Sequence, residues 1–218
     1  MNTKTKISSL LFAVLLILSL AACAGNTAEP LATAQPESAT AQSPQEDPTD
    51  AAPETTAEPG ESKVLVVYFS ATGTTKGVAK KIADITNADL YEIKAAQAYT
   101  DADLDWHDSS SRTTKEQNDK SIRPEIASEK LSLDGYTTVF IGYPIWWGEE
   151  PRILDTFAES YDFDGITVIP FCTSGGSGIG RSGKSLEENA NSGNWLEGAR
   201  FGGSVSEAEL QSWIATVM

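Results

Sequence analysis

The stretch Val64–Lys76, VLVVYFSATGTTK, decides the fold of this chain. Its first six residues are all apolar, which predicts a strand buried on both faces, as in a parallel sheet covered by helices. Apolar residues at helical spacing follow from Val78 to Ile85. A strand that feeds a loop and then a helix can seat a phosphate at the positive end of the helix dipole. The alternative is an ordinary turn with a capping threonine. Five of the six loop residues carry a hydroxyl or are glycine: Ser70, Thr72, Gly73, Thr74 and Thr75.

The first 22 residues are predicted to be an export signal. Lys4 and Lys6 precede an apolar run, Leu10–Ala22, that is too short for a comfortable membrane span. The run ends in Leu-Ala-Ala-Cys, which resembles the lipobox of bacterial lipoproteins, so we expect Cys23 to be lipidated after cleavage. The alternative is an ordinary signal peptide that leaves Cys23 free. The first interpretation places the protein at the extracytoplasmic face of the bacterial cell membrane, held there only by its lipid anchor.

Residues 23–62 are predicted to be a disordered acidic tether rich in Pro, Ala and Thr. Residues 24–62 contain eight acidic and no basic residues and almost nothing large and apolar, so they cannot bury enough surface to offset chain entropy. Residues 63–218 have the length of one domain. They carry 14 basic and 23 acidic residues, a net charge of −9. This balance argues against nucleic acid and suits a redox partner with a basic patch.

Strand and helix patterns alternate along the domain. After the first strand, further strands are predicted at 88–93, 136–143, 165–172 and 195–201. Helices are predicted at 152–160, 182–190 and 206–217, with a short helix near 113–119. This alternation predicts an α/β fold, an open five-stranded parallel sheet with helices on both faces. Such sheets bind ligands beyond the carboxyl ends of their strands.

Three loops at predicted strand ends answer different needs of one ligand. The first, SATGTT at 70–75, offers neutral donors to a phosphate. The second, YPIWWGEEP at 143–151, exposes two tryptophans on which a flat ring can stack. The third, TSGGSG at 173–178, lets backbone groups approach a ring edge closely. A phosphate, a stacked ring and a ring edge together describe flavin mononucleotide (FMN).

With these motifs the domain resembles the flavodoxin family over essentially all of residues 63–218. It is most similar to flavodoxin-like proteins that carry a YPIWWG loop and a PFCT loop followed by glycines. The resemblance implies the strand order 2-1-3-4-5 and non-covalently bound FMN. It places the phosphate on Ser70, Thr72, Gly73, Thr74 and Thr75. It places the flavin ring on Pro144, Ile145, Trp146, Trp147, Gly148, Thr173, Ser174, Gly175, Gly176 and Gly178.

The resemblance also assigns the chemistry to the flavin, so no catalytic side chain and no metal ligand are expected. Gly148 sits where flavodoxins have a glycine whose peptide can flip to bond the reduced N5–H. Glu149 and Glu150 follow it, and carboxylates close to a reduced anionic flavin disfavour reduction, although acids are also common at a helix start. The third loop departs from many flavodoxins because it has no aromatic residue. One flavin face is therefore expected to be open to a substrate or partner, or to be covered by Tyr99 or Trp106.

Other signals compete with this interpretation. Gly178–Ser185 matches the spacing of a nucleotide-binding P-loop, but residues 173–177 separate it from its strand and no later strand ends in a magnesium-binding Asp. Cys172 could be a redox thiol, although a small buried hydrophobe is the more common role. His107 lies among aspartates, which we interpret as solvated surface rather than a metal site.

Three functions remain open at this point. The first is an FMN-dependent oxidoreductase that passes electrons from a reductant to a quinone or another small acceptor. The second is an electron carrier that docks its acidic surface on redox partner proteins. The third is a binding module that has lost its cofactor, against which the intact phosphate and tryptophan loops count. The missing aromatic residue of the third loop favours the first, with the carrier as the alternative.

Overall fold

The fold is described here from a computed structural model, in which residues 62–218 are placed well enough to describe. The predicted signal peptide, the lipidation site Cys23 and the tether up to residue 61 lie outside these residues. Within the described part, no helix is both long enough and apolar enough to cross a membrane.

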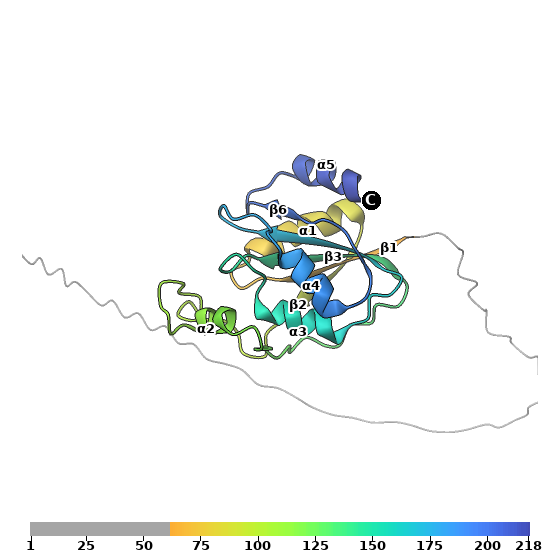
Figure 1. Cartoon of the computed structure of the whole chain (residues 1–218). Helices are drawn as coiled ribbons and strands as arrows, with labels where there is room; N and C mark the ends of the chain where they lie inside the picture. The colour runs from red at the N-terminus through yellow and green to blue at the C-terminus, as the bar shows by residue number, and fades with distance from the viewer. Residues whose placement is uncertain (1–61) are drawn as a thin grey trace, which may run out of the picture. The chain divides into compact units, whose positions relative to one another are not determined.

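The domain is built on one parallel sheet with the order β2-β1-β3-β4-β5, and β6 also pairs with β4 (Figure 1). The strands are β1 (Lys63–Phe69), β2 (Asp89–Ile93), β3 (Tyr136–Pro144), β4 (Thr167–Thr173), β5 (Asn194–Trp195) and β6 (Ala199–Phe201). All of these pairings are parallel. The predicted order 2-1-3-4-5 is therefore confirmed.

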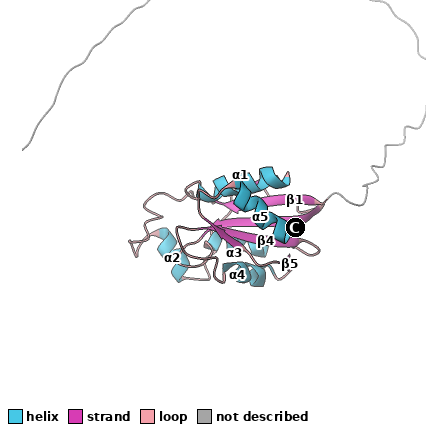
Figure 2. Cartoon of the chain, turned by 90° about the horizontal axis from the view of Figure 1, so that it is seen from above, coloured by secondary structure: helices cyan, strands magenta, loops and turns pink. Residues whose placement is uncertain are grey.

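Helices cover both faces of this sheet (Figure 2). They are α1 (Thr74–Thr86), α2 (Arg112–Asn118), α3 (Arg152–Ser160), α4 (Ser182–Ala190) and α5 (Glu207–Val217). Val66 and Tyr68 of β1 pack in one core with α1 and α5, whereas Leu65 and Val67 pack in a second core with α3 and α4. Successive side chains of a strand point to opposite faces, so a strand covered on both sides must be apolar throughout. This is why VLVVYF carries no polar residue.

The predicted fifth strand, 195–201, is wrong as a single element, because the structure divides it into β5 and β6. The carbonyl of Val168 in β4 accepts a hydrogen bond from the Leu196 N–H at 2.9 Å. Pro170, two residues further along β4, faces the same neighbour but has no N–H to donate. At Gly198 an added Cβ would lie 2.4 Å from the Pro170 carbonyl oxygen. The ladder is therefore interrupted between β5 and β6.

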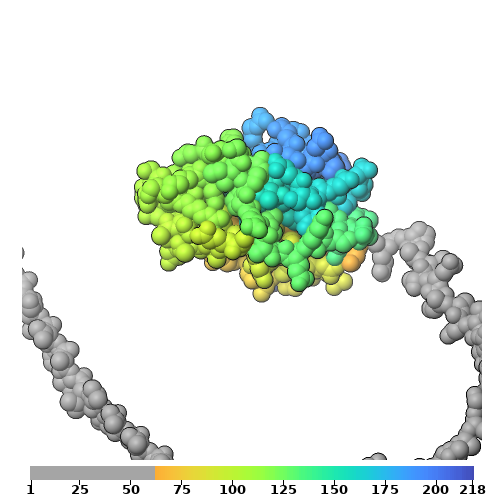
Figure 3. Space-filling model, turned by 90° about the horizontal axis from the view of Figure 1, so that it is seen from below, coloured from red at the N-terminus to blue at the C-terminus, as the bar shows by residue number. Residues whose placement is uncertain are grey.

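A long connection, the 94–130 segment, joins β2 to β3 and contains α2. Figure 3 shows it, in yellow to green, as a lobe at one end of the domain. Its ends are paired at the base, where the Ala96 N–H donates to the Glu125 carbonyl and the Ala127 N–H donates to the Lys94 carbonyl, both at 2.8 Å. Figure 1 places α2 near the end of the sheet at which α1 begins. The segment therefore stands beside the carboxyl end of β1.

Candidate functional site

The three loops predicted to share one ligand are joined to one another in the structure. The hydroxyls of Thr75 and Thr173 are hydrogen-bonded at 2.8 Å, which joins the first loop to the third. The Ile145 N–H donates to the Thr173 carbonyl at 3.0 Å, which joins the second loop to the third. Thr72 and Trp146 line one cavity, so the first and second loops also meet. The loops therefore form a single site at the carboxyl ends of β1, β3 and β4, as expected for this class of sheet.

The first loop keeps backbone donors available. Gly73 is the N-cap of α1, has a φ of +87° and forms no side-chain cap, so the alternative of a capping threonine is wrong. The Gly73 N–H donates to the Ser70 hydroxyl at 3.1 Å. No side chain caps the amides of the first turn, and α1 has no acidic residue there. With Thr72 and Thr74 exposed beside it, this helix start has the chemistry of an anion site without a basic side chain.

The second loop is a tight turn that presents an indole to solvent. Trp146 and Glu149 exchange two backbone hydrogen bonds, at 2.9 and 3.0 Å. The two central residues, Trp147 and Gly148, both have positive φ, +50° and +84°, as a type I′ turn requires. A tryptophan in this region is uncommon, and such backbone strain concentrates at functional sites. The Trp147 side chain is 45% exposed.

Tyr99 supports the second loop from below. Its ring packs edge-on against Trp146 at 5.3 Å and against Phe69 at 5.7 Å. Its hydroxyl donates to Glu116 at 2.7 Å, and the Arg112 guanidinium lies 3.9 Å from its ring centroid. Burial, together with the Glu116 carboxylate, raises the pKa of Tyr99 far above its ordinary value. Tyr99 is therefore committed to packing and does not cover the ring site.

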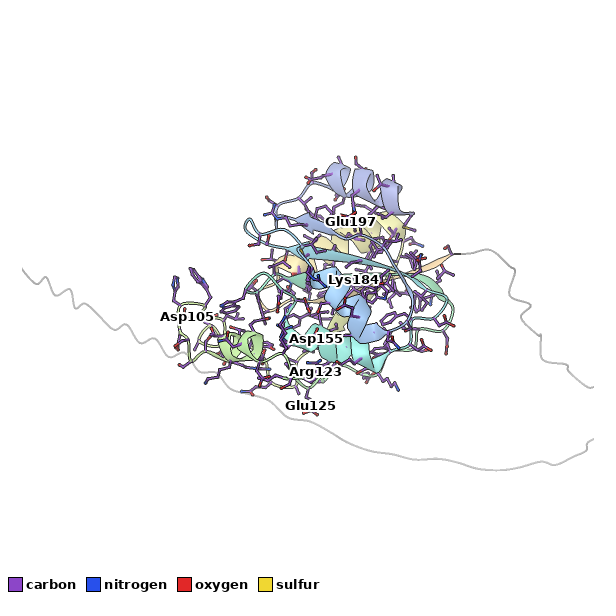
Figure 4. All side chains as sticks on the ribbon, in the orientation of Figure 1. Asp105, Arg123, Glu125, Asp155, Lys184 and Glu197 are labelled. Carbon is purple, nitrogen blue, oxygen red and sulfur yellow. The ribbon has the colours of Figure 1, made fainter. Side chains whose placement is uncertain are left out.

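Trp106 is the other aromatic residue that the sequence analysis considered, and it has a different position. It is 67% exposed, it lines the same cavity as Trp147, and its ring stacks on His107 with 3.4 Å between centroids. Figure 4 labels the neighbouring Asp105 at the outer tip of the 94–130 segment. Of the two candidates, Trp106 is thus the one that faces the site.

The cavity has a volume of about 340 Å³, towards the lower end of the range of about 300–1,000 Å³ that is usual for ligand pockets. None of its lining side chains is charged. Leu104 and Thr113 come from the 94–130 segment, and nothing in the sequence marked them, since their approach depends on the fold of that segment. The lining residues are Thr72, Leu104, Trp106, Thr113, Ile145, Trp146 and Trp147.

The third loop is held by a residue that the sequence analysis missed. Arg200 of β6 donates from Nε to the Ser174 hydroxyl at 3.0 Å and from a terminal nitrogen to the Ser174 carbonyl at 2.6 Å. The loop also approaches the second loop, because a Cβ on Gly180 would lie 3.5 Å from the Gly148 carbonyl oxygen. Gly175, Gly176 and Gly178 are exposed and do not line the cavity with the tryptophans. Arg200 carries no sequence signal, because its role depends on β6 lying beside β4.

A buried ionic group, the Arg152 cluster, lies directly below the second loop and consists of Arg152, Glu149, Glu150 and Asp155. Arg152 lies 3.2 Å from Asp155 and 3.7 Å from Glu150, and it also pairs with Glu149. Arg152, Glu150 and Asp155 are at most 2% exposed. Neither carboxylate oxygen of Glu150 has a hydrogen-bond partner, and burial raises the pKa of Glu150 to about 7. Two buried carboxylates thus share one buried guanidinium.

The Arg152 cluster also fastens the 94–130 segment to the second loop. Lys120 pairs with Glu149 at 2.7 Å, and this contact, more than any other, lowers the pKa of Glu149. The Gln117 amide donates to the Glu150 carbonyl at 3.0 Å. Glu149 therefore faces two cations, which offset its charge near the ring site. In the sequence these polar residues look like a solvated loop.

The competing sequence signals have ordinary structural explanations. Cys172 is fully buried, and burial raises the pKa of its thiol to about 12, so it stays protonated at neutral pH. The P-loop-like stretch does not leave a strand directly, since β4 ends at Thr173 and α4 begins at Ser182. Lys184 pairs with Glu187 on the surface of α4 at 2.9 Å. These residues therefore belong to packing and to the helix surface.

Comparison with known proteins was made for the whole chain. The family model described as Flavodoxin matches residues 63–217. A protein of Bacteroides eggerthii assigned as a flavoprotein is 46% identical with a TM-score of 0.68, over 72% of this chain and 98% of that one. A flavoprotein of Lactobacillus acidophilus, solved in complex with FMN, is 26% identical with a TM-score of 0.55, over 71% of this chain and 99% of that one. No curated protein matches.

Proposed function

This chain belongs to the flavodoxin family, and we propose that it is a redox protein that uses FMN to pass electrons from a reductant to a quinone or another small acceptor. FMN supplies the electron transfer when bound, and the chain's own residues bind and orient it. The observation that carries the proposal is the apolar cavity at the junction of the three loops, with the exposed indoles of Trp106 and Trp147 on its walls. A site designed only to hold a cofactor has no need of so much exposed aromatic surface.

The residues present fit FMN. The phosphate suits the start of α1, where uncapped amides and the exposed hydroxyls of Thr72 and Thr74 are available. The ring suits the cavity beside Ile145 and Trp147, and Gly148 offers its peptide to the ring edge. Neutral donors can hold a phosphate at a helix start without a cation.

The electron carrier remains the second candidate, and the acidic surface favours it. The domain has a net charge of −9, which would steer it to a redox partner with a basic patch. Steady-state oxidation of NADH or NADPH with a quinone separates the two functions. Turnover supports the oxidoreductase, and a flavin reduced only by a partner protein supports the carrier.

We further propose that the protein works outside the cytoplasm, anchored by lipid on Cys23. The sequence Leu-Ala-Ala-Cys at the end of an apolar run supports this. If the proposal is right, Cys23→Ser should move the chain from the membrane fraction to the soluble fraction. A Cys23→Ser chain that stays with the membrane would argue against it.

Cofactor binding is tested with the chain lacking residues 1–22, titrated with FMN and with riboflavin while flavin emission is followed. Tight FMN binding with quenching is expected. Thr74→Glu should weaken FMN binding at least tenfold, because it puts a carboxylate where the phosphate belongs, yet leave riboflavin binding unchanged. A carboxylate in the first turn is compatible with the helix dipole, so folding should not suffer. A protein that leaves the emission of added FMN unchanged would overturn the proposal.

A further inference from the structure

We propose that the cavity between Trp106 and the Trp146–Trp147 turn receives the ring of a planar electron acceptor that is uncharged or cationic, with Trp106 as its stacking partner. This inference rests on the proposed function. It adds to that function a place for the acceptor and a chemical class. The acceptor ring would stand beside the cofactor, on the wall that the 94–130 segment supplies.

The first support is the exposure of apolar surface around the cavity. Trp106 and Trp147 are 67% and 45% exposed, and both line the cavity. In residues 62–218 the other large exposed apolar side chains are Leu90 and Met218, which do not line it. Indoles exposed on two walls of one apolar cavity are a typical arrangement for holding a flat ring by offset or edge stacking.

The second support is that Trp106 is held in place. Its ring stacks on His107, and the Asp105 carboxylate accepts the His107 N–H at 2.9 Å. The Thr113 N–H and hydroxyl donate to the Asp103 carbonyl at 3.1 and 2.6 Å, which fixes the turn to the start of α2. A stacking residue that is already positioned loses less entropy when a ligand binds.

The third support is charge, which selects among flat rings. Asp101, Asp103, Asp105 and Asp108 surround Trp106 in the sequence, and no lining residue of the cavity is cationic. Hydrogen bonds from Thr100 lower the pKa of Asp103, and hydrogen bonds from Ser110 lower the pKa of Asp108, so both are ionised at neutral pH. An anionic acceptor would meet repulsion at this wall, whereas a neutral or cationic one would not.

The test uses the FMN-loaded chain, reduced anaerobically with dithionite and mixed in a stopped-flow instrument with 2-methyl-1,4-naphthoquinone or with 1,4-naphthoquinone-2-sulfonate. The quinone takes up two electrons from the reduced cofactor and two protons, one of them from water, and leaves as the hydroquinone. Trp106→Ala should lower the second-order rate constant for the uncharged quinone about tenfold, and Trp106→Phe should restore most of it. Leu90→Ala, an exposed apolar change on β2, is the matched control and should change nothing.

Charge selection is tested separately with the double variant Asp101→Asn/Asp105→Asn. It should raise the rate constant for the sulfonated quinone about threefold at low salt and leave that for the uncharged quinone unchanged. An equal effect on both quinones, or none on either, would overturn the charge part of the inference.

An equilibrium measurement completes the test, with calorimetric titration of the oxidised FMN-loaded protein by 9-aminoacridine, a planar cation. Trp106→Ala should weaken its binding about tenfold while the FMN dissociation constant stays within twofold. Loss of acridine binding with FMN retained supports the inference. Retained FMN with unchanged rates and acridine binding overturns this inference alone. A chain that never binds FMN overturns the proposed function, and a Trp106→Ala variant that loses FMN makes Trp106 a wall of the cofactor site instead.

Discussion

The first and third loops, on the phosphate side of the site, are joined by neutral hydrogen bonds, whereas the second loop, on the ring side, rests on buried ions. On the phosphate side the Thr75 and Thr173 hydroxyls bond at 2.8 Å and both residues are buried. On the ring side Arg152 faces Glu149, Glu150 and Asp155. The two sides therefore differ in how their stability depends on pH.

A neutral hydrogen bond costs little to bury when both partners are satisfied, and it does not titrate between pH 4 and 9. A buried ion pair is different, because desolvation of each charge must be offset by its partner. Glu150 is the exposed weakness of this arrangement, since neither of its oxygens has a hydrogen-bond partner. The ring side is thus rigid through charges that balance only in part, and the phosphate side is rigid without charge.

The largest expected effect comes from Arg152→Met, which removes the one buried cation of the ring side. Two buried carboxylates then lose their counter-charge, and removal of one partner of a buried pair typically costs about 3–5 kcal/mol. Urea unfolding at pH 7.5 should show this loss. At pH 5 the loss should be smaller, because the stranded carboxylates can take up protons.

The matched control for this change is Arg181→Met, whose side chain is 86% exposed and touches only Glu188, at 3.7 Å. It should alter the free energy of unfolding by less than about 0.5 kcal/mol. An Arg152→Met chain as stable as the control at pH 7.5 would show that the buried carboxylates are not held by Arg152.

Glu150→Gln should have the opposite sign and a smaller size. Burial raises the pKa of Glu150 from 4.5 to about 7, so the folded state binds this proton more tightly than the unfolded state. Stability is then present below pH 4.5 and is lost as the pH rises to about 7. Glutamine cannot ionise, so the variant should match the wild type at pH 4.5 and be more stable above pH 7 by roughly 3 kcal/mol.

The measurement is chemical unfolding of both chains between pH 4.5 and 8.5. Arg152 keeps two carboxylates, Glu149 and Asp155, after the change, so it is not left unpaired. If Glu150→Gln is less stable than the wild type at pH 8, the ionised Glu150 is a net stabiliser of the ring side and the contrast between the two sides disappears.

The phosphate side could be predicted from the sequence, because its elements are local. Six apolar residues, a hydroxyl-rich loop and a helical spacing follow one another directly, and each has one common structural meaning. The ring side could be predicted only in part. The YPIWWG motif identifies the tryptophans, but whether Tyr99 or Trp106 faces the site depends on how the 94–130 segment folds back.

Long-range contacts explain the other differences between sequence and structure. Arg200 reaches Ser174 across 26 residues of chain, and Glu116 supports Tyr99 across 17. No local pattern records such pairs, and polar residues in a long connection look like solvent-exposed surface. The split of the predicted fifth strand has the same origin, since it depends on Pro170 in the neighbouring strand rather than on any breaker that the sequence of residues 195–201 makes evident.

The smallest expected effect is on the phosphate side, from Thr75→Val. The change leaves the Thr173 hydroxyl buried without its partner, which costs about 1–2 kcal/mol of unfolding free energy. Thr75→Val/Thr173→Val should recover most of that loss, because both polar groups are then gone. Neither value should change between pH 5 and 8, since no titrating group faces this bond. A loss that grows with pH would mean that the ions of the ring side reach the phosphate side, and the two halves of the site would then have to be treated as one electrostatic unit.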